Sequence, residues 1–106
     1  MPGRLVGAAR QVINSAQQIV LSPGSSVAAT NPVGVSTYAV LVSIQGDPSV
    51  PCSAMISVDH SGVASMTNGQ AVRSTDRPVV IACAPKEVVA AYGLDDSGTV
   101  YITELN

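Results

Sequence analysis

The sequence predicts an all-β protein: an antiparallel β-sandwich, or a jelly-roll-like barrel, of about seven to nine short strands. Two observations support this class. Short runs rich in Val, Ile, Thr and Tyr recur about every 8–12 residues, with Gly, Pro, Asn and Asp between them. After residue 16 no segment has the periodicity of an amphipathic helix. At 106 residues the chain has the length of one domain, so we divide it into an N-terminal arm or short helix (1–16) and a β-sandwich domain (17–106).

The expected strands follow the apolar runs and end at turn residues. The runs are 17–22, 26–30, 37–45, 52–58, 63–66, 70–73, 78–83, 88–94 and 99–105. The clearest is 37–45, in which Tyr38, Val40, Val42 and Ile44 alternate with Thr37, Ala39, Leu41 and Ser43. We expect the first set to face the core. Because the second set is also apolar or small, we expect another protein surface to cover it.

The composition favours a packed subunit over a free monomer. The chain has no Phe or Trp, three Tyr, and charged residues at only 11%, so its core gains less per position than an aromatic core would. We therefore expect a homo-oligomer. The five basic residues are scattered, which argues against a nucleic-acid partner, and no apolar run is long enough for a membrane helix, so we expect no membrane association.

The N-terminal segment carries an apolar pattern that the sandwich does not require. Leu5, Val6, Ala9, Val12, Ile13 and Ala16 have the spacing of one helical face, but Gly3 and Gly7 interrupt it, so a short helix and an extended arm remain alternatives. The segment is too interrupted for a signal peptide. We expect it to bind a partner subunit through Arg4, Leu5, Val6, Ala9, Arg10, Val12 and Ile13.

The sequence Asp59-His60-Ser61 contains the only histidine and could be mistaken for a catalytic triad. Triad members come from separate chain positions and converge in space, whereas consecutive residues at a strand end point to alternate faces. Asp, Ser and Gly are the residues that turns prefer. We therefore interpret 59–62 as a turn, and we predict no catalytic residue.

No metal or cofactor site is predicted. One His and two isolated Cys do not provide the ligands of a zinc or blue-copper site. Asp95 and Asp96 lack the alternating ligands of a calcium loop and fit a hairpin turn. Cys52 and Cys83 lie in apolar runs, which is typical of buried thiols, and the sequence leaves open whether they form a disulfide.

The order of these signals resembles a group of small β-sandwich proteins of tailed bacteriophage virions. The matching segments are I-V-L-S-P-G-S-S-V, A-T-N-P, V-L-V-S-I-Q-G-D-P, A-M-I-S-V-D-H-S-G, A-S-M-T-N-G-Q-A-V, P-V-V-I-A-C, V-V-A-A-Y-G-L and G-T-V-Y-I-T-E-L. The resemblance covers residues 19–105, and the first sixteen residues are not part of it.

The resemblance implies a non-enzymatic virion structural protein, made in the host cytoplasm. Such a protein would be a capsid decoration or minor capsid protein that stabilises the particle, and its partners would be the major capsid protein or other virion structural proteins. The alternative is a fibre, spike or tail-associated module that binds a host receptor or carbohydrate. Against the alternative, sugar sites usually present aromatic platforms, and three Tyr offer little material for one.

Overall fold

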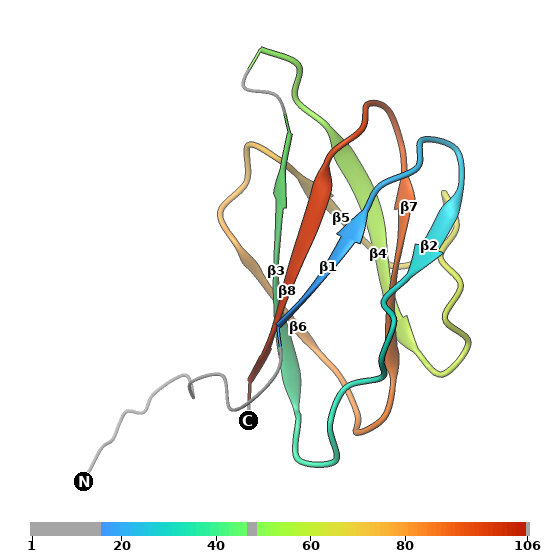
Figure 1. Cartoon of the computed structure of the whole chain (residues 1–106), viewed down its shortest axis with the longest axis vertical. Coiled ribbons are helices and arrows are strands. Elements are labelled where there is room, and N and C mark those ends of the chain that lie inside the picture. Colours follow the sequence, from blue (N-terminus) through green and yellow to red (C-terminus); the bar gives the residue numbers. More distant parts are fainter. Residues whose placement is uncertain (1–15, 47–48, 106) are drawn as a thin grey trace, which may run out of the picture.

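A computed structural model describes residues 16–46 and 49–105, which form a sandwich of two four-stranded antiparallel sheets (Figure 1). This confirms the predicted all-β class. The strands are β1 (Ala16–Val20), β2 (Ser26–Ala28), β3 (Ala39–Gln45), β4 (Ser53–Asp59), β5 (Gln70–Arg73), β6 (Val79–Ala82), β7 (Val88–Gly93) and β8 (Thr99–Leu105).

The strand order identifies the sandwich as a jelly roll. One sheet has the order β1-β8-β3-β6 and the other β2-β7-β4-β5. The strand pairs are therefore first with last, second with seventh, third with sixth, and fourth with fifth. A long hairpin of β1–β4 against β5–β8 gives these pairs when it rolls into two sheets, which is the jelly-roll arrangement.

The core lies between the sheets and consists mainly of small aliphatic side chains. Val40, Val42 and Ile44 of β3 are buried, as predicted. They meet buried residues of the other sheet, such as Ala54 and Ile56 of β4. Because β strands alternate their side chains between two faces, the intervening residues of β3 point out of the sandwich.

Three details differ from the sequence prediction. Residues 63–66 form no strand; only an isolated bridge pairs Ser65 with Asn68. Tyr38 lies before β3 and is 67% exposed, because the core column of that strand begins only at Val40. Ala16, which the sequence analysis placed at the end of the arm, pairs with Thr103 and is the first residue of β1.

Candidate interaction face

The candidate site is the outer face of the β1-β8-β3-β6 sheet. The residues of these strands that alternate with the buried ones point outward. The strand register places them in four cross-strand rows. The rows are Val20–Thr99–Gln45, Gln18–Tyr101–Ser43, Ala16–Thr103–Leu41–Val80 and Leu105–Ala39–Ala82.

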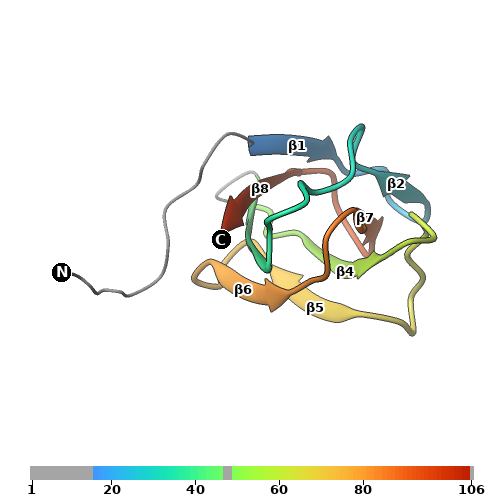
Figure 2. The ribbon, with the colours of Figure 1, turned by 90° about the horizontal axis from the view of Figure 1, so that it is seen from below.

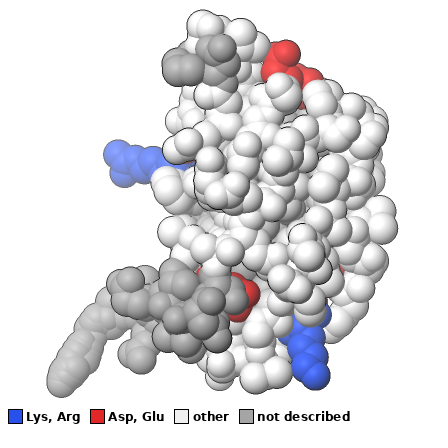
Figure 3. Space-filling model, in the orientation of Figure 1, with Lys and Arg blue, Asp and Glu red and all other residues white. Residues whose placement is uncertain are grey.

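No outward residue of these four strands, all of which lie within 16–46 and 49–105, carries a charge. The two rows nearest Leu105 are apolar except for Thr103, and we call them the apolar patch: Ala16, Ala39, Leu41, Val80, Ala82 and Leu105. Val80 is 59% exposed. Charged atoms are also sparse among the described residues in the space-filling view (Figure 3). An exposed apolar patch of this kind marks a surface that another protein covers.

The outer face of the other sheet is covered in part by the chain itself. Ser57 of β4 and Ala90 of β7 point outward, yet both are buried. The β4–β5 loop, residues 60–69, swings out beyond β4 and β2 (Figure 2). The Ala64 N–H donates to the Ser26 hydroxyl of β2 at 2.9 Å, and Ala64 is buried. This loop therefore covers part of the outer face of the β2-β7-β4-β5 sheet, whereas no described segment covers the outer face of the β1-β8-β3-β6 sheet.

The Asp59-His60-Ser61 sequence forms a turn at the start of that loop. The Asp59 carboxylate accepts hydrogen bonds from the Ser61 N–H at 2.8 Å and the Ser61 hydroxyl at 2.6 Å. These bonds hold the pKa of Asp59 below its usual range. The His60 side chain is 71% exposed, with its Nδ1 4.0 Å from Glu87 Oε2. Asp59 thus holds the loop backbone and Ser61, which is the role of a turn residue.

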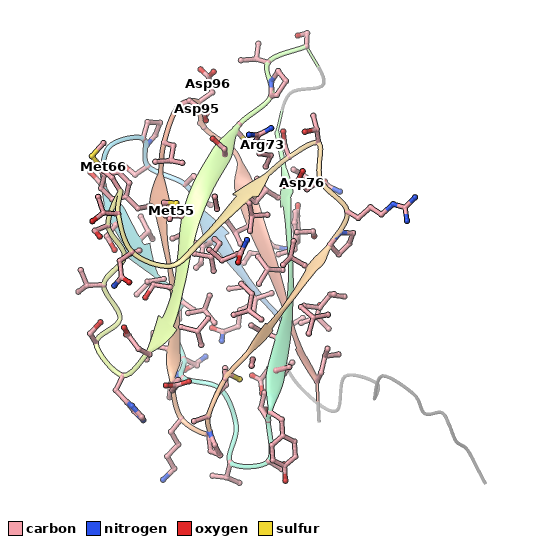
Figure 4. All side chains as sticks on the ribbon, turned by 180° about the vertical axis from the view of Figure 1, so that it is seen from behind. Met55, Met66, Arg73, Asp76, Asp95 and Asp96 are labelled. Carbon is pink, nitrogen blue, oxygen red and sulfur yellow. The ribbon has the colours of Figure 1, made fainter. Side chains whose placement is uncertain are left out.

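Asp95 and Asp96 lie in the loop between β7 and β8 (Figure 4). These two strands belong to different sheets, so the loop connects the sheets and the predicted hairpin turn is wrong. Asp95 accepts hydrogen bonds from the Ser53 N–H at 2.7 Å and the Ser53 hydroxyl at 3.0 Å. The backbone bond from Ser53 is the main cause of a lowered pKa at Asp95. Its oxygens therefore anchor the start of β4. Within the described part of the chain, no group of three or more His, Cys, Asp or Glu side chains could hold a metal ion.

The two cysteines are free thiols at opposite ends of β3. Cys52 packs near the end of this strand, where a Cβ on Gly46 would lie 2.8 Å from its Sγ. Cys83 donates its N–H to Tyr38 O just before the strand begins. Burial is the main cause of a raised pKa at both thiols, so both are less ionised at neutral pH than an exposed cysteine. Cys52 and Cys83 therefore form no disulfide with each other.

Glu104 is a buried carboxylate that the sequence analysis missed. It follows Val100 and Ile102 on the inner face of β8 and is 5% exposed. Its Oε1 accepts hydrogen bonds from the Thr37 hydroxyl at 2.6 Å and the Gly34 N–H at 3.0 Å. These bonds satisfy one oxygen and tie the β2–β3 connection to the end of the sheet. Strict alternation along 99–105 was the signal that would have placed Glu104 inside.

The predicted partner-binding residues Arg4, Leu5, Val6, Ala9, Arg10, Val12 and Ile13 lie outside the described residues. They precede Ala16, which belongs to the apolar patch. The three tyrosines are dispersed: Tyr101 is on the uncharged face, Tyr92 on the outer side of the other sheet, and Tyr38 before β3. They form no common aromatic platform.

Searches of protein families, curated proteins and solved structures found no match for this chain. Within residues 16–46 and 49–105, no helix has the length and apolar character needed to cross a membrane.

Proposed function

We propose that the chain is a non-enzymatic structural subunit of a tailed-phage virion, a decoration or minor capsid protein that assembles through the uncharged outer face of its β1-β8-β3-β6 sheet. The main support for the proposal is this uncharged face. A four-stranded surface without charge, half of it apolar, suits contact with another protein.

The jelly-roll topology is compatible with the proposed function but does not favour it over other functions of the fold. Jelly rolls serve in viral capsid proteins, in lectins and in cupins, and a fold does not by itself specify a function. The side chains of the described residues help to distinguish among these functions. The described residues bring no ligands together for a metal centre, and the dispersed tyrosines give the receptor or carbohydrate alternative no aromatic platform.

Attachment to a particle also fits the sparse charge of the chain. A small protein that diffuses freely generally relies on surface charge for solubility, and this one has 11% charged residues and a net charge of −2. A subunit repeated on a symmetric lattice gains affinity from many weak contacts, so each contact can be small. A modest apolar patch is sufficient for that mode of binding.

The test places one charge on the face. Val80→Glu puts a carboxylate in the apolar patch, and Val63→Glu is the matched control, because both valines are 59% exposed and Val63 lies on the 60–69 loop. Particles are banded from cells that produce them with either variant, and the chain is quantified by mass spectrometry. We expect Val80→Glu to reduce its copy number at least tenfold and Val63→Glu to leave it unchanged. Absence of the unsubstituted chain from the particles would refute the proposal.

A further inference from the structure

We propose that residues 1–15 of one copy bind the apolar patch of a second copy, so that the chain forms a homo-oligomer by arm exchange. This inference rests on the proposed function, because it names the partner of the same face. The occupant is identified by its chemistry, by where it joins the described fold, and by its length.

The chemistry of the arm matches that of the patch. The arm contains the apolar residues Leu5, Val6, Ala9, Val12 and Ile13, no acidic residue, and the basic residues Arg4 and Arg10. The patch offers aliphatic side chains and no charge. Burial of such surfaces against each other gains roughly 25 cal/mol per Å² and leaves no charged group of the patch desolvated.

The place where the arm joins the fold brings it to the patch. Residue 15 is followed directly by Ala16, which is itself a member of the patch and pairs with Thr103 in the same cross-strand row. The arm therefore begins beside the surface that it is proposed to cover.

The length also fits. The four strands span about 14 Å at the usual strand spacing of about 4.8 Å. Leu5 to Ile13 covers at least about 12 Å even at the short rise of an α-helix. The apolar part of the arm is thus long enough to cross most of the sheet as a helix, and the whole sheet as an extended chain, which rises about 3.3 Å per residue.

A second copy is the better receptor than the chain's own face. β1 keeps its ladder as far as the Ala16–Thr103 pair, so only Asn14 and Ser15 separate Ile13 from the paired strand. To lie on its own face, the arm would have to reverse within those two residues. To reach a neighbour it can continue away from β1, and exchange between two copies makes the contact twice.

The first measurement is the mass of the purified full-length chain by sedimentation equilibrium. We expect an oligomer that Val80→Glu in the patch and Ile13→Glu in the arm each convert to a monomer, while Val63→Glu leaves it intact. Circular dichroism checks that every variant keeps its β spectrum. A monomeric parent chain, or an oligomer unaffected by either Val80→Glu or Ile13→Glu, would overturn the inference.

The second measurement identifies the contact. A benzoylphenylalanine photocrosslinker replaces Ala9, and this chain is mixed with ¹⁵N-labelled copies before irradiation. We expect crosslinks between light and heavy chains at peptides that contain Leu41 or Val80. Crosslinks only within one chain would show that the arm covers its own face, and crosslinks elsewhere would exclude the patch; either result overturns the inference. Because both measurements use free protein, they are independent of whether the chain is found in particles.

Discussion

The outer faces of the two sheets differ in what covers them. On the outer face of the β2-β7-β4-β5 sheet, Ser57 and Ala90 are buried, and the 60–69 loop is hydrogen-bonded to Ser26. Over the β1-β8-β3-β6 sheet, no described segment lies across the strands, and the outward side chains carry no charge. The second face has an apolar half and no charged side chain, which is unusual for a solvated surface. The first face is covered in part within the chain, and we infer that the second is covered by another subunit.

The comparison also explains where the turn chemistry is concentrated. Asp59 and Asp95 bind backbone N–H groups at the two ends of β4, which is a strand of the covered sheet. The loops on this side therefore depend on carboxylates for their shape. The open face has no carboxylate among its outward residues; its polar side chains are uncharged, and the rest of it is apolar.

The largest expected effect is a loss in the free energy of unfolding, and it should differ between the inner and outer faces of β3. Ile44 of β3 is 4% exposed and packs in the core, so Ile44→Ala should lower the free energy of unfolding by about 2–5 kcal/mol. Leu41 lies on the outer face of the same strand and is only half-buried, so Leu41→Ala should cost much less in the isolated monomer. Urea denaturation of both variants in the monomeric Ile13→Glu background measures the two losses. Equal losses would show that the outer face is already covered within one chain.

The next largest effect is expected from displacing the 60–69 loop, which lies over the β2-β7-β4-β5 sheet. Gly69 has φ +107°, and a Cβ there would overlap the Ile56 carbonyl oxygen of β4. Gly69→Ala should therefore displace the loop and cost about 2–3 kcal/mol. Gly24 is the control, because it has φ +77° with no atom within 4 Å of a built Cβ, so Gly24→Ala should cost about 1 kcal/mol. Similar losses for the two variants would mean that the loop does not depend on close contact with β4.

Much of the fold was predictable from local pattern. Alternation in 37–45 gave the buried column Val40, Val42 and Ile44, and turn residues separated the other strands. The same alternation wrongly placed Tyr38 in the core. A row of buried side chains along a strand ends where the opposite sheet ends, and this position depends on the tertiary structure. The prediction of a strand at 63–66 was also wrong: this run has the composition of a strand, but only Ala64 is buried, and Val63 and Met66 are exposed.

The interaction face was predictable only in part. The apolar or small character of Ala39, Leu41 and Ser43 indicated that something covers the outer side of this strand. The sequence could not show that Val80, Thr103 and Ala16 lie in one row with Leu41, because that row depends on strand order. Strands far apart in the chain become neighbours only through the jelly-roll pairing.

A pH titration should separate the two faces without any substitution. The hydrogen bond from Ser61 lowers the pKa of Asp59 and the hydrogen bond from the Ser53 N–H lowers that of Asp95, so each carboxylate stabilises the fold above its unfolded pKa. That contribution is lost as the pH falls through the lowered, folded-state pKa. We expect amides of 60–69 to lose hydrogen-exchange protection in acid before amides of β3 and β8. If β3 and β8 lost protection first, the carboxylates would not be what holds the covering loop.

The smallest expected effect concerns His60, at the start of the covering loop. Its side chain is 71% exposed and lies 4.0 Å from Glu87, a geometry in which an ion pair contributes little. His60→Ala should therefore change the free energy of unfolding by no more than about 0.5 kcal/mol and leave particle incorporation unchanged. Ser61→Ala is the informative neighbour, because it removes the hydroxyl that donates to Asp59 at 2.6 Å and accepts from the Val63 N–H at 3.2 Å. That change should cost about 1 kcal/mol. If His60→Ala instead abolished function in a protein with an unchanged denaturation midpoint, His60 would have a chemical role that the turn does not explain, and the non-enzymatic proposal would fail.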